Sequence, residues 1–277
     1  MSSTPPGAQA TRGPARAPSP ARSSGMLAER VCIVTGAARG IGQEFALHFA
    51  GLGARVVAAD RLSCDRTIRR IEEASGQAVG ATGDVTSASD AAAIVETALD
   101  AFGSVDVLVN NAALYGGISI RGFEDIPEDE WDRVMSVNVK GVWQMCRAVA
   151  PPMRLQGGGR IINISSNVVF MGKPGFLHYV ASKGAVWALT GALSREFAGS
   201  GVTVNALAPG YTTTEATRSM AAPEVVSALE AEIMQSQSMK RLMEPSDLVG
   251  AAAFLASDAA EQITGQTITV DGGTITR

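Results

Sequence analysis

The chain has 277 residues, of which 46% are hydrophobic and 5% aromatic, and its formal net charge of -4 with scattered Lys and Arg argues against a nucleic-acid partner. Three cysteines without paired spacing and two histidines exclude a disulfide framework and a zinc site, so no metal is predicted. No apolar run reaches the roughly 18 residues of a membrane span, and the sequence predicts a cytoplasmic protein with no membrane partner.

The first 25 residues differ in composition from the rest of the chain. They are rich in Pro, Ser, Ala, Gly and Thr, and they carry Arg12, Arg16 and Arg22 without any acidic residue. Such a segment has too few apolar side chains to offset the entropy of ordering, so residues 1–25 are predicted to be a disordered leader. An organelle transit peptide has a similar composition, but the prolines interrupt the amphipathic helix that it needs. Residues 26–277 are predicted to form one folded domain.

From Val31 onward, short β-branched runs alternate with longer stretches of helical composition. Repeated strand and helix units build right-handed crossovers, and hence a parallel sheet with helices on both faces. The sequence therefore predicts an α/β fold with a doubly wound, Rossmann-like parallel sheet, in which ligands bind beyond the carboxyl ends of the strands. The predicted strands are Val31–Thr35, Arg55–Ala59, Ala78–Thr82, Val105–Val109, Arg160–Ile164, Thr203–Leu207 and Thr267–Val270, and the predicted helices are Gly40–Gly51, Ser87–Phe102, Glu128–Ala150, Tyr179–Ala198 and Ser246–Ser257.

The first predicted strand runs directly into a glycine-rich segment, Gly36-Ala-Ala-Arg-Gly40-Ile-Gly42. Glycines at such a place let the backbone turn tightly and approach a pyrophosphate, whose charge the free N–H groups of the following helix stabilise. The spacing G-x-x-x-G-x-G differs from the usual dinucleotide pattern. By itself it is equally compatible with an ordinary turn between a strand and a helix.

The second predicted strand is followed by a carboxylate, Asp60, about 20 residues beyond the glycines. A carboxylate there accepts hydrogen bonds from both hydroxyls of the NAD ribose, and it repels the 2'-phosphate of NADP. Arg39 and Arg61 favour the opposite choice, because either guanidinium can reach a phosphate. The balance predicts NAD, with NADP as the less favoured cofactor, and a simple turn cap is the other role open to Asp60.

Tyr179 and Lys183 are four residues apart, so on a helix they share one face. A phenol with a pKa near ~10 is a poor base at neutral pH, but an adjacent ammonium group and an oxidised nicotinamide both favour the phenolate. This pair therefore suits proton transfer to and from an alcohol oxygen. A solvated helical pair without chemistry is the alternative interpretation of the same spacing.

The order of these features resembles that of the short-chain dehydrogenase/reductase family over nearly the whole predicted domain. The resemblance implies that Ser166 polarises the substrate oxygen, and that Tyr179 transfers the proton. It implies that Lys183 lowers the tyrosine pKa and holds the nicotinamide ribose, and that Asn138 supports a water in a proton relay from Lys183. Ser166 is preferred to Ser165 because it stands thirteen residues before Tyr179, which is the usual interval in that family.

The resemblance extends to the residues that would hold the cofactor. Asp84-Val85 is similar to the pair that meets the adenine ring, and Asn110-Asn111-Ala112 is similar to the segment that stabilises the central strand. Ala113 departs from the family, which commonly has glycine there, and its methyl group trims the cofactor or substrate space. The implied cofactor-binding residues are Gly36, Arg39, Gly40, Ile41, Gly42, Asp60, Asp84, Val85, Asn111, Ala112, Tyr179, Lys183, Pro209, Gly210, Thr212 and Thr214.

In that family the substrate lies beneath a mobile segment, here about residues 212–244. This segment contains four methionines, which either line an adaptable apolar pocket or pack the segment onto the body of the protein. With the aromatic residues nearby, they predict a hydrophobic secondary alcohol or its ketone as the small-molecule substrate. His178 is expected to be exposed and without a role. The predicted substrate pocket consists of Leu114, Tyr115, Val168, Phe170 and Tyr211.

Two other functions are compatible with the same fold. A reductase of 3-oxoacyl chains on a carrier protein would use NADPH and a basic surface, against which Asp60 and the acidic composition count. A non-catalytic nucleotide-binding scaffold would have lost part of the Ser166, Tyr179 and Lys183 set, which is intact here. The resemblance also implies a homotetramer, with contacts through the helices predicted at Glu128–Ala150 and Tyr179–Ala198.

Overall fold

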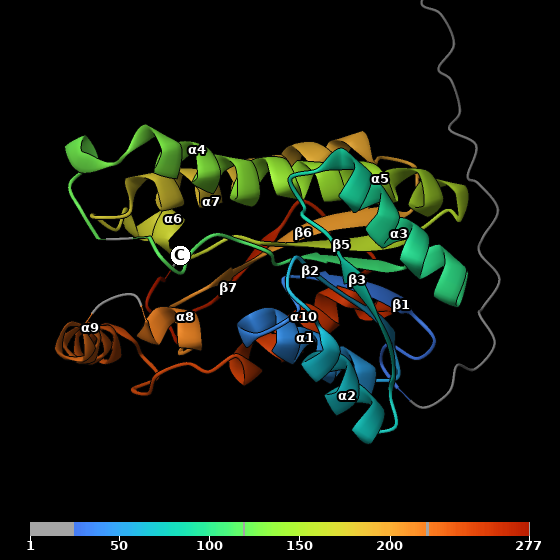
Figure 1. Ribbon diagram of the computed structural model, residues 1–277, viewed down its shortest axis with the longest axis horizontal. Coiled ribbons are helices and arrows are strands. Elements are labelled where there is room, and N and C mark those ends of the chain that lie inside the picture. Colours follow the sequence, from blue (N-terminus) through green and yellow to red (C-terminus); the bar gives the residue numbers. More distant parts are fainter. Residues whose placement is uncertain (1–24, 119, 220–221, 277) are drawn as a thin grey trace, which may run out of the picture.

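A seven-stranded sheet with the order β3-β2-β1-β4-β5-β6-β7 forms the centre of the computed structural model (Figure 1), which describes residues 25–118, 120–219 and 222–276. All neighbouring strands pair in parallel. The order reverses between β1 and β4, which creates the crevice where doubly wound sheets bind ligands. The predicted fold is confirmed, whereas the predicted leader lies outside the described residues except for Gly25. The strands are β1 (Val31–Thr35), β2 (Arg55–Asp60), β3 (Gln77–Thr82), β4 (Val107–Asn110), β5 (Gly159–Ile164), β6 (Val202–Pro209) and β7 (Thr267–Val270).

Helices cover both faces of the sheet, and Figure 1 shows α1, α2 and α10 on one side and α3, α5 and α7 on the other. Three further helices, α6, α8 and α9, gather beyond one end of the sheet. In the part of the chain that the structure describes, no helix has the length and apolar character needed to cross a lipid bilayer. The helices are α1 (Gly40–Gly51), α2 (Asp65–Glu73), α3 (Ala88–Phe102), α4 (Glu128–Met135), α5 (Gly141–Leu155), α6 (Val168–Met171), α7 (Leu177–Glu196), α8 (Glu215–Arg218), α9 (Pro223–Ser236) and α10 (Ser246–Ala256).

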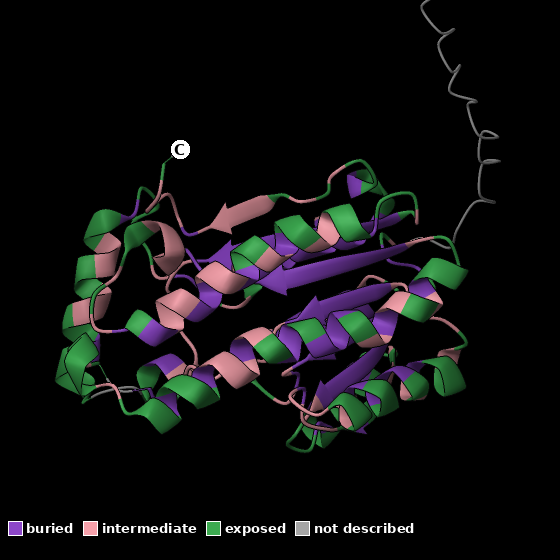
Figure 2. Cartoon of the chain, turned by 90° about the horizontal axis from the view of Figure 1, so that it is seen from above, coloured by how far each residue is buried: buried purple, intermediate pink, exposed green. Residues whose placement is uncertain are grey.

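The core consists of two apolar layers, one on each face of the sheet. Alternate side chains of a strand point to opposite faces, so Val31 and Ile33 belong to one layer, and Cys32 and Val34 to the other. Figure 2 shows the central strands of the sheet, which are β1, β4, β5 and β6, as buried, and the helices with exposed outer sides. The continuous apolar runs of the sequence are therefore the strands that both layers cover.

The single helix predicted at Glu128–Ala150 is wrong. A π-helical turn at Ser136–Lys140 separates α4 from α5. Asn138 lies within this π-helical turn. Its amide nitrogen donates to the carbonyl of Leu114 at 3.2 Å and to the hydroxyl of Ser182 at 3.0 Å. Such turns are frequent at functional sites, and this one aims a buried amide at two neighbouring segments.

The second of these helices also ends later than predicted. The predicted end, Ala150, directly precedes two prolines, which are uncommon inside a helix. The helix nevertheless includes Pro151 and Pro152. Met153 is fully buried against Gly159 at the start of β5, so tertiary packing holds this last turn in place.

Helix α2 was not predicted from the sequence. It is short, and within it only Thr67 and Ile71 are buried. The Thr67 hydroxyl donates to the carbonyl of Ala37 at 2.8 Å and accepts from the Gln43 amide at 2.8 Å, which fastens α2 to α1. The other predicted elements agree with the structure to within two residues at each end.

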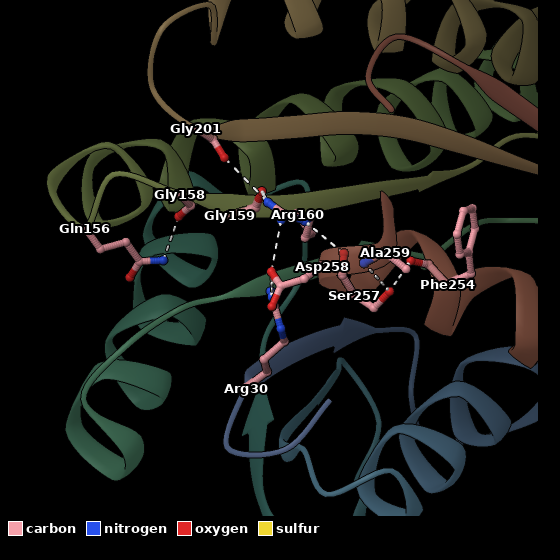
Figure 3. A network of polar contacts seen from close by, with 10 residues as sticks. All are labelled: Arg30, Gln156, Gly158, Gly159, Arg160, Gly201, Phe254, Ser257, Asp258 and Ala259. Atoms are coloured by element: carbon pink, nitrogen blue, oxygen red, sulfur yellow. Dashed lines mark hydrogen bonds and ion pairs between the residues drawn. The ribbon is translucent and has the colours of Figure 1, made fainter. Parts of the chain in front are cut away.

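The amino ends of the strands are closed by a polar network centred on Asp258, in the short helix Asp258–Ala260 (Figure 3). Arg30, which precedes β1, and Arg160, in β5, both contact one carboxylate oxygen of Asp258. Arg160 also donates to the carbonyl of Ser257 at 3.3 Å. The network joins three distant parts of the chain and leaves the opposite, carboxyl ends of the strands free for the site.

Candidate active site

A cavity of about 440 Å³ opens at the carboxyl ends of the strands. Every residue predicted to hold the cofactor contributes to its lining, as do Ser166, Tyr179 and Lys183. Among the described residues, no group of three or more His, Cys, Asp or Glu side chains could hold a metal ion. The cavity therefore brings together predicted site residues that lie far apart in the sequence, from Gly36 to Thr214.

One end of the cavity is formed by the glycine-rich segment between β1 and α1. Gly36 and Gly40 adopt φ values of +69° and +58°, which disfavour residues with a side chain. A Cβ atom on Gly42 would lie 2.1 Å from the carbonyl oxygen of Gly36. No side chain caps the N-terminus of α1, and its first turn holds no acidic residue. The segment thus presents free backbone N–H groups and a helix N-terminus to an anion.

Asp60 lies at the end of β2 on the wall of the same cavity. Its carboxylate accepts from the N–H groups of Ala38 at 3.1 Å and of Leu62 at 3.0 Å. The carboxylate is thereby fixed beside the glycine-rich segment. Arg39 and Arg61 line the cavity too, and the Arg39 guanidinium lies 3.8 Å from Glu215 of α8.

The glycine-rich segment is held to β4 by Thr35 and Asn111. The Thr35 hydroxyl accepts from the N–H groups of Asn111 and Ala112, each at 3.1 Å. The Asn111 amide donates to the carbonyls of Thr35 at 2.9 Å and of Gly36 at 3.3 Å. These contacts fix the switch point between β1 and β4 as a rigid floor.

Three side chains with proton chemistry meet near the centre of the cavity. Tyr179 and Lys183 extend from α7, and the Ser166 hydroxyl lies close enough to Tyr179 to act on its pKa. The Lys183 ammonium donates to the carbonyl of Ile164 at 2.8 Å and lies 5.8 Å from the centre of the Tyr179 ring. Ser165 instead donates to the carbonyl of Lys183 at 3.0 Å, and so positions α7. Of the two serines, Ser166 is the one that acts on the tyrosine.

Burial shifts the pKa values of this group. Desolvation raises the pKa of Tyr179 above its usual value, nearby Tyr115 adds to this rise, and the hydrogen bond to Ser166 opposes it. Desolvation also lowers the pKa of Lys183 to about 8. In the protein alone, Tyr179 is therefore a phenol, ready to donate a proton, and it needs further positive charge nearby to accept one.

Asn138 does not line the cavity. Besides the bonds from its amide nitrogen, its amide oxygen accepts from the N–H of Leu114 at 2.7 Å. Asn138 thus fixes Leu114 in the cavity wall and Ser182, the neighbour of Lys183. The relay role that the family resemblance implies for Asn138 stays a prediction.

The other end of the cavity is apolar and aromatic. The ring of Tyr115 lies 5.0 Å from that of Tyr179 and 6.4 Å from that of Phe176, between ring centres. Leu114, Tyr115, Val168 and Tyr211 line the cavity as placed by the sequence prediction. Phe170 is not among the lining residues, because its ring packs edge-on against Trp187 at 6.4 Å.

Of the described methionines of residues 212–244, Met243 is buried in the core and packs this segment onto the body, as the second interpretation predicts, whereas Met239 is exposed. None of Met234, Met239 and Met243 belongs to the lining. Met220 lies outside the described residues. No local pattern in the sequence identifies several further lining residues, which the fold brings from distant parts of the chain: Met171, Lys173, Phe176, Leu229, Ile233, Ser236 and Thr274.

The expectation for His178 is wrong. The imidazole is fully buried, and its Nε2 lies 2.9 Å from a carboxylate oxygen of Glu130. A histidine beside an exposed helix start gives no local signal of this partner, because Glu130 lies on another helix. The contact therefore appears only in the folded protein.

The shifted pKa of Lys183 predicts a change of stability with pH. From about pH 8 to about pH 10.4, the unfolded chain holds a proton on Lys183 that the folded protein lacks, so the free energy of unfolding rises with pH. The rise amounts to about 3 kcal/mol over this window. Lys183→Met removes the titrating group and with it this rise. Between about pH 8 and about pH 10.4, the free energy of unfolding of the variant is therefore expected to fall relative to that of wild type by the same amount. Urea unfolding at several pH values measures the difference, and a constant difference, equal to that of exposed Lys240→Met, would contradict the assignment.

The sheet order, the glycine-rich segment and the serine, tyrosine and lysine set together define a class, and the chain belongs to the short-chain dehydrogenase/reductase family. A family model described as enoyl-(acyl carrier protein) reductase matches residues 36–275. An uncharacterized oxidoreductase of Mycobacterium tuberculosis (strain ATCC 25618 / H37Rv) is 41% identical over 255 residues, which cover 91% of this chain and 100% of the relative.

Two further comparisons agree with this membership. The 3-oxoacyl-[acyl-carrier-protein] reductase FabG of Staphylococcus epidermidis is 38% identical over 244 residues, covering 87% of this chain and 97% of the relative. The crystal structure of a short-chain type dehydrogenase/reductase from Mycobacterium marinum superimposes with a TM-score of 0.82 at 32% identity, covering 90% and 96% of the two chains. The resemblance drawn from the sequence is confirmed, and the protein is an oxidoreductase of this family.

Proposed function

We propose that the protein transfers hydride between NAD(H) and a hydrophobic secondary alcohol or its ketone. The observation that carries this proposal is the meeting of Ser166, Tyr179 and Lys183 in one cavity, whose far wall holds Asp60. A non-catalytic scaffold has no need of a buried ammonium group, which is costly to desolvate. The intact set therefore favours an enzyme.

The residues at the glycine-rich end fit a dinucleotide. The N-terminus of α1 has no side-chain cap, and Gly40, Ile41 and Gly42 line the cavity, so backbone N–H groups are available there to a pyrophosphate. Asp60 would accept from the adenosine ribose, and Asp84 and Val85 would meet the adenine ring. Lys183 would hold the second ribose, with Pro209, Gly210 and Thr214 near the carboxamide. A nicotinamide cofactor supplies the hydride acceptor or donor, which no protein side chain can be.

The protein's own part in the reaction is to bind the substrate oxygen and to move one proton. In the direction of ketone reduction, the Ser166 hydroxyl donates a hydrogen bond to the carbonyl oxygen and polarises it. Tyr179 Oη then gives its proton to that oxygen as negative charge develops there. The Lys183 ammonium stabilises the phenolate that remains. In alcohol oxidation, the same phenolate takes the proton back.

The apolar end of the cavity supports a hydrophobic substrate. Tyr115, Phe176 and Leu229 offer ring and methyl surfaces there, and the charged side chain of Lys173 also lines the cavity. Residues 212–244 act as a lid in this proposal, because the hydroxyl of Tyr211 contacts Glu230 of α9 at 3.2 Å. Exposed Trp143 and Trp187, on α5 and α7, suit the contacts of a homotetramer.

A carrier-bound 3-oxoacyl substrate with NADPH is the second candidate. It is favoured by the 38% identity to the Staphylococcus epidermidis reductase and by Arg61, which lines the cavity beside Asp60. The cavity wall at Asp60 carries a negative charge where NADPH has a phosphate, which favours NAD. The two candidates differ in cofactor as well as in substrate.

We expect turnover of secondary aryl or cyclic alcohols with NAD, followed by the absorbance of the reduced cofactor. The panel pairs NAD and NADP with apolar alcohols, sugar alcohols and hydroxy acids, and it includes 3-oxoacyl thioesters with NADH and NADPH. Best turnover with sugars or charged acids would contradict the hydrophobic substrate. Best turnover of the thioester with NADPH would establish the second candidate.

A further inference from the structure

One buried carboxylate, that of Glu130 on α4, joins two neighbouring segments, which lead to Tyr115 and to Tyr179 in the cavity lining. One of its oxygens accepts from Nε2 of His178 at 2.9 Å. The other lies 3.6 Å from the guanidinium of Arg121, which follows β4 in the segment before α4. Glu130 thus connects the start of α7 to the segment that follows β4.

The three side chains are shielded from water. The side chain of His178 is 0% exposed, that of Glu130 is 9% exposed, and that of Arg121 is 29% exposed. Removing a carboxylate and a guanidinium from water is costly, and replacement by apolar residues of similar size is often as stable. Glu130 and His178 do not line the cavity, so they do not bind substrate or cofactor directly. Glu130 and His178 can therefore act on the reaction only through residues next to them.

The two partners of Glu130 each belong to a segment that carries a tyrosine of the cavity lining, Tyr179 or Tyr115. His178 directly precedes Tyr179 in α7, so the imidazole fixes the turn that carries the phenol. Arg121 ends the segment that carries Tyr115, and its backbone N–H donates to the carbonyl of Gly175 at 3.2 Å. A Cβ atom on Gly175 would lie 2.8 Å from Ile120, so the two segments are in close contact there.

We propose that Glu130 is a positioning residue that sets how the ring of Tyr115 packs against the ring of Tyr179, and thereby the face that a prochiral ketone presents. The centres of these two rings are 5.0 Å apart, which is a packing contact, and each ring belongs to a segment that the carboxylate holds. A ketone with unequal substituents fits beside Tyr115 in one orientation when this packing is fixed. This inference rests on the proposed function and goes beyond it, since it concerns stereochemical control.

The test compares Glu130→Gln with Glu128→Gln in the reduction of acetophenone by NADH. The control makes the same chemical change on the same helix, at an exposed position. For Glu130→Gln we expect kcat/KM to fall by roughly 10- to 100-fold, as small misplacements of reacting groups do. We also expect the ratio of the two alcohol enantiomers, measured by chiral chromatography, to move toward unity. A merely structural loss of active protein leaves that ratio unchanged.

Cofactor affinity separates this role from general damage. The NADH dissociation constant, measured by protein fluorescence, is expected to stay close to that of wild type in Glu130→Gln. An enantiomeric ratio and KM equal to those of wild type in a folded Glu130→Gln protein would overturn the proposal. If that variant does not fold, Arg121→Met removes only the outer contact of Glu130 and is judged by the same ratio.

Failure of the proposed function has a different signature. If wild type reduces no ketone, the function fails, and the inference is then tested by hydrogen exchange of peptides covering residues 113–118 and 175–180. Arg121→Met is expected to accelerate exchange in both peptides, whereas Arg133→Met, on the exposed side of α4, is expected to leave it unchanged. Equal exchange in the two variants would overturn the inference.

Discussion

Tyr179→Phe is expected to lower kcat by about 10³-fold or more with any accepted alcohol or ketone. The variant keeps the ring that packs against Tyr115 but removes the hydroxyl that Ser166 contacts and that donates the proton. Lys183 does not replace it, because its ammonium group is turned toward the carbonyl of Ile164. The measurement is steady-state turnover, followed by the absorbance of the reduced cofactor.

The same variant is expected to bind NADH nearly as tightly as wild type, which fluorescence titration checks. Tyr115→Phe is the matched substitution, since it removes a phenol from the same cavity, and its loss of kcat is expected to be at least an order of magnitude smaller. Turnover by Tyr179→Phe at the wild-type rate would show that another group carries the proton.

Asp60→Asn is expected to weaken NADH binding by about 10- to 100-fold and to narrow the preference over NADPH. The carboxylate is positioned at the cavity wall by the N–H groups of Ala38 and Leu62. Loss of its charge weakens the hydrogen bonds to the ribose and removes the repulsion of a 2'-phosphate, while Arg61 remains to attract one. Dissociation constants for both cofactors measure the change.

Asp65→Asn is the control for this prediction, because it makes the same change at an exposed position five residues further along. It is expected to leave both dissociation constants as they are. If wild type binds NADPH more tightly than NADH, the assignment of Asp60 as the selective residue is wrong, and the carrier-bound candidate gains support.

The features that the sequence predicted correctly are those with local signals. The apolar runs of β1 and β5 depend only on burial between two layers, and the spacing of Tyr179 and Lys183 depends only on the helical repeat. The order of motifs then identified the family. Asp60 could be placed because the end of a strand fixes where its carboxylate lies.

The features that it missed depend on contacts between distant residues. The π turn exists where Asn138 meets Leu114 and Ser182, and the sequence around it has an ordinary helical pattern. His178 looks like a surface residue until α4 brings Glu130 beside it. The lining by Phe176 and Ile233 likewise requires the fold, since no repeat or motif marks them.

The network at the amino ends of the strands bears on how the chain completes its fold. Arg30 and Asp258 are 228 residues apart in sequence, so the contact between them closes nearly the whole described chain into one loop. Such a closure has a large entropic cost and forms late, after the local strand and helix units. Arg160, which is buried near the amino end of the central strand β5, contacts the same carboxylate, so its ion pair also forms only after Asp258 is present. During synthesis on the ribosome, the two guanidinium groups therefore lack this counter-charge until Asp258 has been added to the chain.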